Sequence, residues 1–439
     1  MKSIRLLLSS FFFILTVFSV SIAQESVSAN ANNPRSSNQA IINQSNFETF
    51  KSLIIPELQP LVESNLLQMD VTKELSYSTE NISALSKPNT KSQPIETRLV
   101  ETLNAKKHAN FALIFKTEAK ELTAQTYPAE EILWNTYSSI VSQKHLKLNF
   151  SSQVLTTDAL DSKYQITGSL ERLLSYSNKS EKAIPQLFRE KISTLSPDSI
   201  SPYSWLTFKF VNDTPEFIWV FSPAINKTRQ MISANRSDPI LFGLPEIDDI
   251  FTWSGNPHAV DARVISVVRA LVPFPTTSPG RLFNLENSCF GIEDNGMTNS
   301  QTNKWNFETK KFPAGAGWLP NAAVFSPRNL IKIQLHSLDP YYKDSIQMIY
   351  LDSELMVPIY KISYNLLGRR RKIVFGSYGL AYSADKSKKM LYPSFNVSIN
   401  YENQEAQLIN YDQITSCPNL NIETKLKEFE PIKIAQKIE

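Results

Sequence analysis

The sequence predicts an α+β protein in which antiparallel strands dominate, and three observations support this prediction. Apolar and polar residues alternate with period two in several segments on both sides of residues 275–327. Helical periodicity is clearest in one short stretch, residues 128–141. Only 11 of the 439 residues are glycine. This scarcity disfavours glycine-rich phosphate loops and dinucleotide-binding folds.

Residues 1–23 have the features of a secretory signal peptide. Lys2 and Arg5 precede an apolar run from Leu6 to Ile22, and Ala23 completes a small-x-small exit. An uncleaved anchor is the alternative, but the serines within the run favour cleavage. Cleavage would change the formal charge from +3 to 3 − 2 = +1, a balance that disfavours a nucleic-acid partner. We therefore expect an exported, periplasmic protein.

The composition divides the rest of the chain into four parts. Residues 24–45, rich in Asn, Ser and Gln, are expected to be a disordered leader. Residues 46–125 read as an N-terminal extension of mixed character, and residues 126–400 as the main domain. Residues 275–327 form a Pro-, Gly- and Asn-rich loop insert within that domain. Residues 401–439 are expected to be a peripheral C-terminal tail.

Local patterns predict one helix and a series of strands. Pro128 suits the first turn of a helix ending at Val141, and Glu130 and Glu131 complement its N-terminal dipole. Turn residues separate the alternating segments, as in an antiparallel meander. The expected strands are residues 205–211, 216–221, 227–232, 261–274, 331–336, 346–351, 357–364, 372–378 and 395–401.

Two cysteines, Cys289 and Cys417, remain in the mature chain. In an oxidising compartment an isolated pair is usually a disulfide, which would pin the loop insert; two buried free thiols are the alternative. Four scattered histidines and the absence of a Cys-x-x-Cys pair give no metal-site pattern. We expect neither a metal nor a cofactor.

Signatures of a secreted hydrolase, the third class considered, are missing. The sequence has no Gly-x-Ser-x-Gly and no His-Glu-x-x-His. Asp248 and Asp249 are adjacent and are expected to lie in a solvated loop, and His258 is expected to be a turn residue, with a catalytic base as its alternative.

The basic run Arg369, Arg370, Arg371 and Lys372 follows a turn glycine and predicts a solvated hairpin tip. Contact with anionic lipid headgroups, or with a partner, is its functional alternative.

Four motifs together resemble a bacterial periplasmic family of unknown function whose members look like outer-membrane lipoprotein-sorting proteins of the LolA/LolB/RseB kind. Residues 126–380 carry the resemblance. The chain departs from the family at two places. It has Lys227, Arg229 and Arg236 where the family has several arginines after the Pro turn, and it has Asn365 where the family has Asp. The motifs are Glu131-Ile-Leu-Trp-Asn135, Phe217-Ile-Trp-Val-Phe-Ser-Pro223 with Arg229, Leu244 to Phe251 with Ser254-Gly-Asn-Pro257, and Ile349-Tyr-Leu-Asp352 with Pro358, Tyr360, Tyr364 and Gly368.

The resemblance implies a strongly bent antiparallel sheet, a half-barrel that helices cover above a hydrophobic cavity. It also implies a non-enzymatic periplasmic protein that binds or hands over the acyl chain of a lipid or lipoprotein. The alternative is an accessory interaction module of an envelope export system, with a transporter or outer-membrane partner and no ligand of its own.

Four aromatic residues are the candidates for lining such a cavity. Period two places Phe208 and Phe210 on one face of a strand, and Trp219 and Phe221 on one face of the next. The pattern does not tell which pair faces the inside, and we expect truncations of the four to divide into a ligand-binding pair and a structural pair.

Overall fold

The computed structural model describes residues 40–75, 129–140, 145–156, 162–174, 186–240, 245–293, 305–309, 316–417 and 425–435. Residues 38–439 group into one compact unit. The expected signal peptide and most of the expected leader lie outside the described residues. The α-helices are α1 (Phe47–Phe50), α2 (Gln59–Glu63), α4 (Ala129–Ile140) and α5 (Asn306–Thr309). Among the described helices none is long and apolar enough to cross a membrane.

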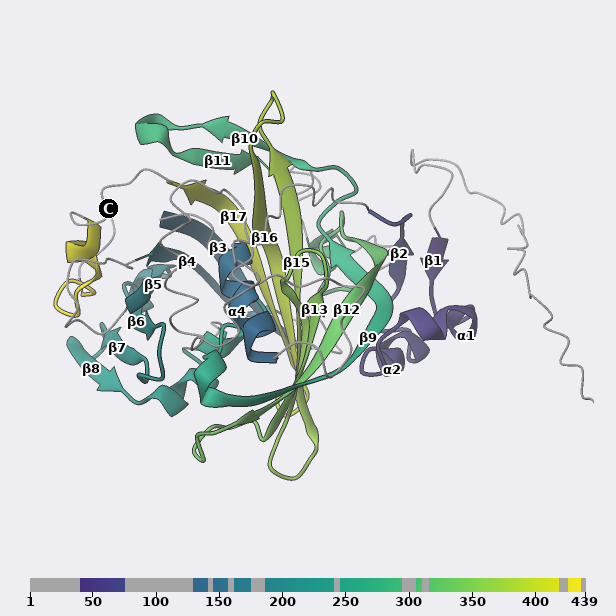
Figure 1. The fold of residues 1–439 in the computed structure, drawn as a ribbon, viewed down its shortest axis with the longest axis horizontal. Coiled ribbons are helices and arrows are strands. Elements are labelled where there is room, and N and C mark those ends of the chain that lie inside the picture. The colour runs from purple at the N-terminus through teal and green to yellow at the C-terminus, as the bar shows by residue number, and fades with distance from the viewer. Residues whose placement is uncertain are drawn as a thin grey trace, which may run out of the picture. The chain divides into compact units, whose positions relative to one another are not determined.

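Most strands join in one antiparallel row, which runs β9, β12, β13, β14, β15, β16, β17, β3, β4, β5, β6, β7, β8 (Figure 1). The strands of the row are β3 (His145–Thr156), β4 (Ser162–Leu174), β5 (Gln186–Ser196), β6 (Ser204–Phe210), β7 (Phe217–Ser222), β8 (Lys227–Met231), β9 (Val260–Phe274), β12 (Val324–Ser337), β13 (Ile346–Asp352), β14 (Pro358–Tyr364), β15 (Arg370–Tyr382), β16 (Lys389–Asn400) and β17 (Glu405–Ser416). The short strands are β1 (Ala40–Ile42), β2 (Met69–Val71), β10 (Gly280–Asn284) and β11 (Phe290–Glu293).

The predicted helix and strands are confirmed. Two of the predicted segments, the peripheral C-terminal tail and the N-terminal leader, were drawn too long, because each contains a strand of the sheet. β17 falls in the expected peripheral tail, yet it pairs with β16 on one side and β3 on the other, so it is a central strand. β1 falls in the expected leader and pairs with β2. The local sequence patterns gave no prediction for β3, β4 and β5.

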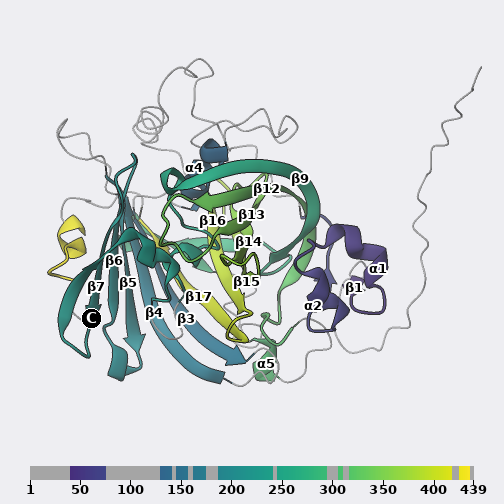
Figure 2. The ribbon, with the colours of Figure 1, turned by 90° about the horizontal axis from the view of Figure 1, so that it is seen from below.

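The sheet bends strongly around α4. In the strand order β12 and β5 lie far apart, yet Ile333 of β12 and Phe188 of β5 share one buried cluster with Trp134 of α4. A flat sheet would hold these strands too far apart for one helix to contact both, since neighbouring strands lie about 4.8 Å apart. The sheet therefore curls around the helix (Figure 2), and the predicted bent antiparallel sheet covered by a helix is confirmed.

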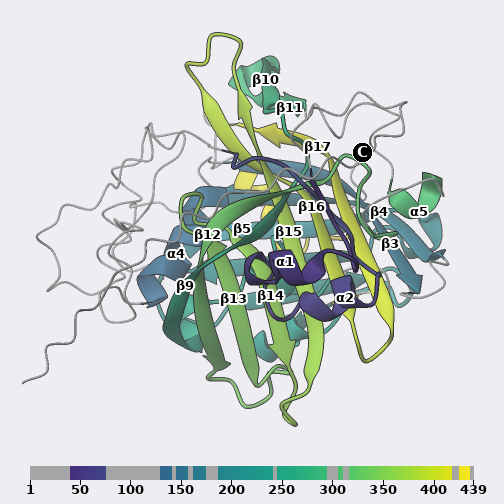
Figure 3. The same ribbon diagram turned by 90° about the vertical axis from the view of Figure 1, so that its right-hand side faces the viewer.

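Residues 40–75 cover the outer face of the sheet at β12 to β15 (Figure 3). The hydroxyl of Tyr350 on β13 donates to Glu57 Oε2 at 2.9 Å, and Arg370 Nη1 donates to the Glu57 carbonyl at 2.8 Å. β2 pairs in parallel with β12 through Val71 and Phe325. This part of the expected N-terminal extension thus packs into the same core as the main domain.

Residues 425–435 cover the outer face at β4 to β6. Phe429 and Ile434 are buried against Leu206 and Phe208. Lys425 Nζ lies 3.1 Å from Glu171 Oε1 of β4. Each end of the described chain therefore packs on the outside of the sheet.

The predicted disulfide between Cys289 and Cys417 is confirmed, and it joins positions 128 residues apart. Its first cysteine lies between β10 and β11, and its second directly follows β17. β11 also pairs with β17. The loop insert is therefore fastened to the sheet by both backbone and covalent bonds, as expected for an oxidising compartment.

Candidate functional site: a charged interior

Residues 245–256, here called the inner loop, enter the space inside the curved sheet. All twelve are buried. The hydroxyl of Tyr378 on β15 donates to the carbonyl of Phe251 at 2.7 Å. A Cβ atom at Gly376 of β15 would collide with Oγ1 of Thr252, so the loop approaches the strand where a glycine leaves room.

The inner loop holds two consecutive side-chain-bearing residues in the left-handed region. The φ angle is 53° at Phe251 and 69° at Thr252. Such angles are uncommon for bulky or β-branched residues and persist only where the surroundings enforce them. The contacts of the loop with the sheet therefore maintain a backbone that the loop would not keep alone.

Asp248 and Asp249 do not lie in a solvated loop, contrary to the prediction. Both are buried because cations of the surrounding elements face them. Asp248 Oδ1 accepts from Arg236 Nε at 2.5 Å, and Tyr342 donates to Oδ2 of the same carboxylate at 2.5 Å. Asp249 Oδ1 accepts from Lys361 Nζ of β14 at 2.9 Å.

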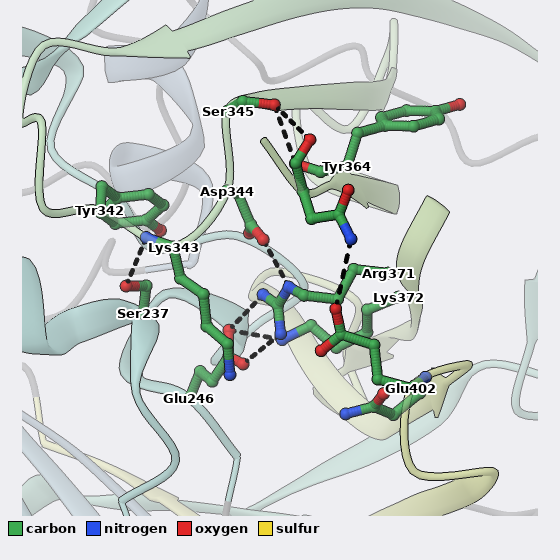
Figure 4. A network of polar contacts seen from close by, with 12 residues as sticks. Ser237, Glu246, Tyr342, Lys343, Asp344, Ser345, Tyr364, Arg371, Lys372 and Glu402 are labelled. Atoms are coloured by element: carbon green, nitrogen blue, oxygen red, sulfur yellow. Dashed lines mark hydrogen bonds and ion pairs between the residues drawn. The ribbon is translucent and has the colours of Figure 1, made fainter. Parts of the chain in front are cut away.

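The basic run is not a solvated tip either. Arg369 is exposed and Arg370 half-buried, but Arg371 and Lys372 are buried. The turn ends at Arg369, and Arg371 is the extra residue of a bulge, since Ser363 pairs with Lys372 and Tyr364 with Arg370. The bulge lets both cations reach Glu246 of the inner loop: Arg371 Nη1 lies 2.8 Å from Oε1, and Lys372 Nζ lies 2.5 Å from Oε2 (Figure 4).

The charges around Glu246 stabilise its ionised form. Burial alone would raise the pKa of this carboxyl, but Lys372, Arg371 and Lys361 lower it to about 2. Lys361 shows the complementary effect: burial would lower its pKa, and Asp249 with neighbouring carboxylates raises it. These groups therefore act as ion pairs at neutral pH.

A second part of the network joins β6 to the other end of the inner loop. Lys209 Nζ of β6 lies 2.9 Å from the Ser254 carbonyl, 3.3 Å from Glu216 Oε1 and 2.5 Å from the Tyr137 hydroxyl of α4. Arg236 Nη2 donates to the same Ser254 carbonyl at 2.6 Å. Burial, together with the nearby Arg236 cation, lowers the pKa of Lys209 to about 7.

The interior network contains equal numbers of buried acids and bases. Balanced pairing lowers the cost of burying charge, while the removal of one partner would leave an uncompensated ion. Its acids are Glu190, Glu216, Glu246, Asp248, Asp249 and Asp344, and its bases are Arg172, Lys209, Arg236, Lys361, Arg371 and Lys372. The network fixes the inner loop to β6, β14 and β15, and it connects the loop to α4 through Lys209 and Tyr137.

Beside the ions lies an apolar compartment that α4 closes. Ile132, Leu133 and Trp134 of α4 are fully buried against inner residues of β12 and β13, among them Ile333 and Ile349. His258, predicted to be a turn residue, lies in a short 3₁₀ turn, and its Nδ1 is 3.0 Å from Glu130 Oε1 at the start of the helix. The interior therefore combines an apolar cluster, which the side chains of α4 fill, with a charged border.

The four aromatic candidates share one face, so the expected division into two pairs is wrong in its geometry. The rings of Phe208 and Trp219 lie 4.8 Å apart in an edge-to-face arrangement. Lys209 between Phe208 and Phe210 faces α4, so the phenylalanines point the other way. Phe208, Phe210 and Phe221 are buried, and Trp219 partly so, in the cluster beneath residues 425–435 on the outer face.

The charged network was not predicted from the sequence, although one signal for it was present. Lys209 and Lys361 are the only charged residues of strands that otherwise contain apolar residues with a few Ser and Thr. A lone cation inside such a strand must be buried, and a buried cation needs a carboxylate partner. The identity of that partner depends on which loop the sheet encloses.

Comparisons with known proteins give structural likenesses only, since no protein-family model and no curated protein matches the sequence. An outer membrane lipoprotein-sorting protein domain from Vibrio parahaemolyticus is similar with a TM-score of 0.46 and 11% identity, over 72% of this chain and 100% of that one. A DUF1329 family protein from Desulfovibrio piger gives 0.44 and 8%, over 69% and 95%. A LolA superfamily protein from Nitrosomonas europaea gives 0.38 and 11%, over 70% and 98%. These include members of the group that the sequence motifs resemble.

Proposed function

We propose that this chain is a non-enzymatic periplasmic protein that binds the acyl chain of a lipid or lipoprotein inside its curved sheet. The observation that carries the proposal is the apolar compartment between α4 and the inner residues of β12 and β13. Ile132, Leu133 and Trp134 fill that compartment. An acyl chain would take their place on the same apolar surface when α4 moves away.

The charged network supports binding over catalysis. A general acid or base works best with a pKa near the operating pH, whereas Glu246 is held ionised by its cations. Lys209 does have a pKa near neutrality, about 7. Its Nζ, however, is already engaged by Tyr137, Glu216 and two backbone carbonyls. The network is therefore suited to holding the inner loop beside the compartment.

An accessory interaction module is the second candidate. One observation favours it: the inner loop and α4 occupy the inside of the sheet, with each acid of the network facing a Lys or Arg. A module of this kind would use its outer surface and carry no ligand. Its partner would be a transporter or an outer-membrane component of the envelope.

Native mass spectrometry of protein purified from its own envelope tests the proposal. We expect a co-purifying acyl species on a fraction of the molecules, removable by delipidation and restored by added fatty acid. A matched pair of variants gives the location: Ile333→Ala on the inner face should change fatty-acid uptake, whereas Phe208→Ala on the outer face should not. A bare chain that takes up no fatty acid would instead favour the interaction module.

A further inference from the structure

The most exposed apolar side chains of the described residues gather at one end of the sheet. Six large hydrophobic residues in the described part of the chain are more than 60% exposed. Five of them belong to three segments at this end, and the sixth, Ile432, lies in the C-terminal segment. The five are Ile232 (63%), Leu338 (62%), Tyr341 (80%), Leu366 (81%) and Leu367 (76%).

Hydrogen bonds show that the three segments are neighbours. The β12–β13 loop (338–345) meets the β14–β15 turn (365–369), because Ser345 N donates to the Tyr364 carbonyl at 2.9 Å and Ser345 Oγ to the Asn365 carbonyl at 2.8 Å (Figure 4). Lys343 N donates to Ser237 Oγ at 3.1 Å, which joins the turn after β8 to the same loop. Both hairpin loops project beyond the strands at the lower end of the sheet in Figure 1.

The buried network holds the β12–β13 loop in a fixed orientation. Tyr342 points inward to Asp248, and Asp344 points inward to Arg371 Nε at 2.6 Å. Their neighbours Tyr341 and Lys343 are exposed. Anchored and exposed residues therefore alternate along this loop, and the inward contacts keep its apolar tip exposed to solvent.

Cations accompany these tips. Lys343 and Arg369 are exposed beside them, and Arg370 is half-buried. Three acids lie nearby: Asp339 Oδ1 accepts from Tyr341 N at 2.9 Å, the exposed Glu402 lies 3.5 Å from Asn365, and the exposed Asp238 accepts from Asn235 at 2.8 Å. Leucine and tyrosine tips with adjacent Lys and Arg are the composition that enters the interface of an anionic bilayer.

We propose that this end of the sheet, formed by residues 232–238, 338–345 and 365–369, docks on the surface of an anionic lipid bilayer. The leucines and Tyr341 enter the headgroup region, while Lys343 and Arg369 contact lipid phosphates. Separate protruding tips fit the deformable surface of a bilayer better than the broad, closely packed face that a stable protein interface needs. Docking is independent of acyl binding inside the sheet.

Vesicle flotation of the whole mature protein tests this proposal. Vesicles of phosphatidylglycerol and phosphatidylethanolamine are compared with vesicles of phosphatidylcholine. We expect the protein to float with the anionic vesicles, and the double variant Leu366→Ser/Leu367→Ser to bind about tenfold more weakly, because two apolar insertions are lost. The matched control is Ile432→Ser, which removes an equally exposed apolar side chain elsewhere and should bind like the parent protein.

Two further measurements separate the outcomes. Arg369→Ser should reduce the salt dependence of binding without abolishing it. Fatty-acid uptake is measured on the same variants and should not change, so a failure of docking is distinguishable from a failure of the proposed acyl binding. The proposal is overturned if the parent protein ignores anionic vesicles, or if the folded double variant floats as well as the parent.

Discussion

Asp249 lies between two lysines from adjacent strands, Lys361 of β14 and Lys372 of β15. Lys361 Nζ is 2.9 Å from Oδ1, and Lys372 Nζ contacts Oδ2. All three side chains are buried. Asp249 thus contacts two cations of the sheet, and Lys372 also contacts Glu246 of the same loop. The inner loop therefore supplies the carboxylates that allow both lysines to be buried.

Asp249→Asn should therefore be strongly destabilising. The amide keeps the size of the carboxylate but removes the carboxylate that Lys361 contacts, while Lys372 keeps Glu246 as a partner. We expect the free energy of unfolding to fall by about 3–5 kcal/mol, because a buried cation loses its counter-ion. The matched control is Glu293→Gln, which neutralises the exposed ion pair with Arg281 and should cost no more than about 1 kcal/mol. Urea unfolding measures both. Equal losses would contradict the role assigned to the inner network.

Lys209 should make stability rise with pH above neutrality. Its pKa is lowered from 10.5 to about 7 in the folded protein, so between these values the unfolded chain binds a proton that the folded chain lacks. Unfolding then takes up a proton, and a higher pH disfavours unfolding. Relative to Lys209→Met, the parent should gain on the order of 3 kcal/mol between pH 7 and about 9.5. Urea unfolding at both pH values measures the difference, and a constant difference would refute the assignment.

Gly376→Ala should expel Thr252 from its place against β15. The added methyl would collide with Oγ1 of Thr252, and overpacking of this kind costs about 1–3 kcal/mol. Thr252→Gly should recover part of the loss, since it removes the clash and relieves a φ of 69°. A double-mutant cycle with thermal unfolding gives the coupling. Additive effects of the two changes would show that loop and strand do not touch there.

Reduction of the disulfide should lower stability without opening the sheet. The bond closes 128 residues, for which the chain-entropy model gives at most about 5 kcal/mol. β11 and β17 remain paired by backbone hydrogen bonds in the folded state. Unfolding of Cys289→Ser/Cys417→Ser should shift to lower urea, while far-ultraviolet circular dichroism stays unchanged. An unaltered midpoint would contradict the stabilising role.

The strands that could be predicted from the sequence are those whose two faces differ in composition or whose turns are marked. β6, β7 and β9 have such patterns, and their predicted spans are within a few residues of the observed ones. β17 could not be found this way, because Asn410, Tyr411 and Asp412 interrupt its alternation. Its place became evident only from pairing with β16 and β3, which are distant in sequence.

The charged interior shows a second limit of sequence reasoning. Asp248 and Asp249 have the composition of a solvated turn, and Arg371 and Lys372 that of a hairpin tip. Asp249, Arg371 and Lys372 are each buried beside an opposite charge from a segment more than a hundred residues away, whereas Asp248 pairs with Arg236, 12 residues before it. The local sequence pattern indicates whether a segment on its own would be exposed to solvent. Ion pairs with distant segments can bury it instead.

Photolabelling with a diazirine fatty acid, followed by peptide mapping, reports where an acyl chain lies and so tests acyl binding inside the curved sheet. We expect cross-links to α4 and to the inner residues of β12 and β13, such as Ile333 and Ile349, and their loss when unlabelled fatty acid competes. The outer aromatic residues Phe208 and Trp219 should remain unlabelled. Labelling confined to that outer cluster, or none that competes with fatty acid, would contradict an acyl-binding interior.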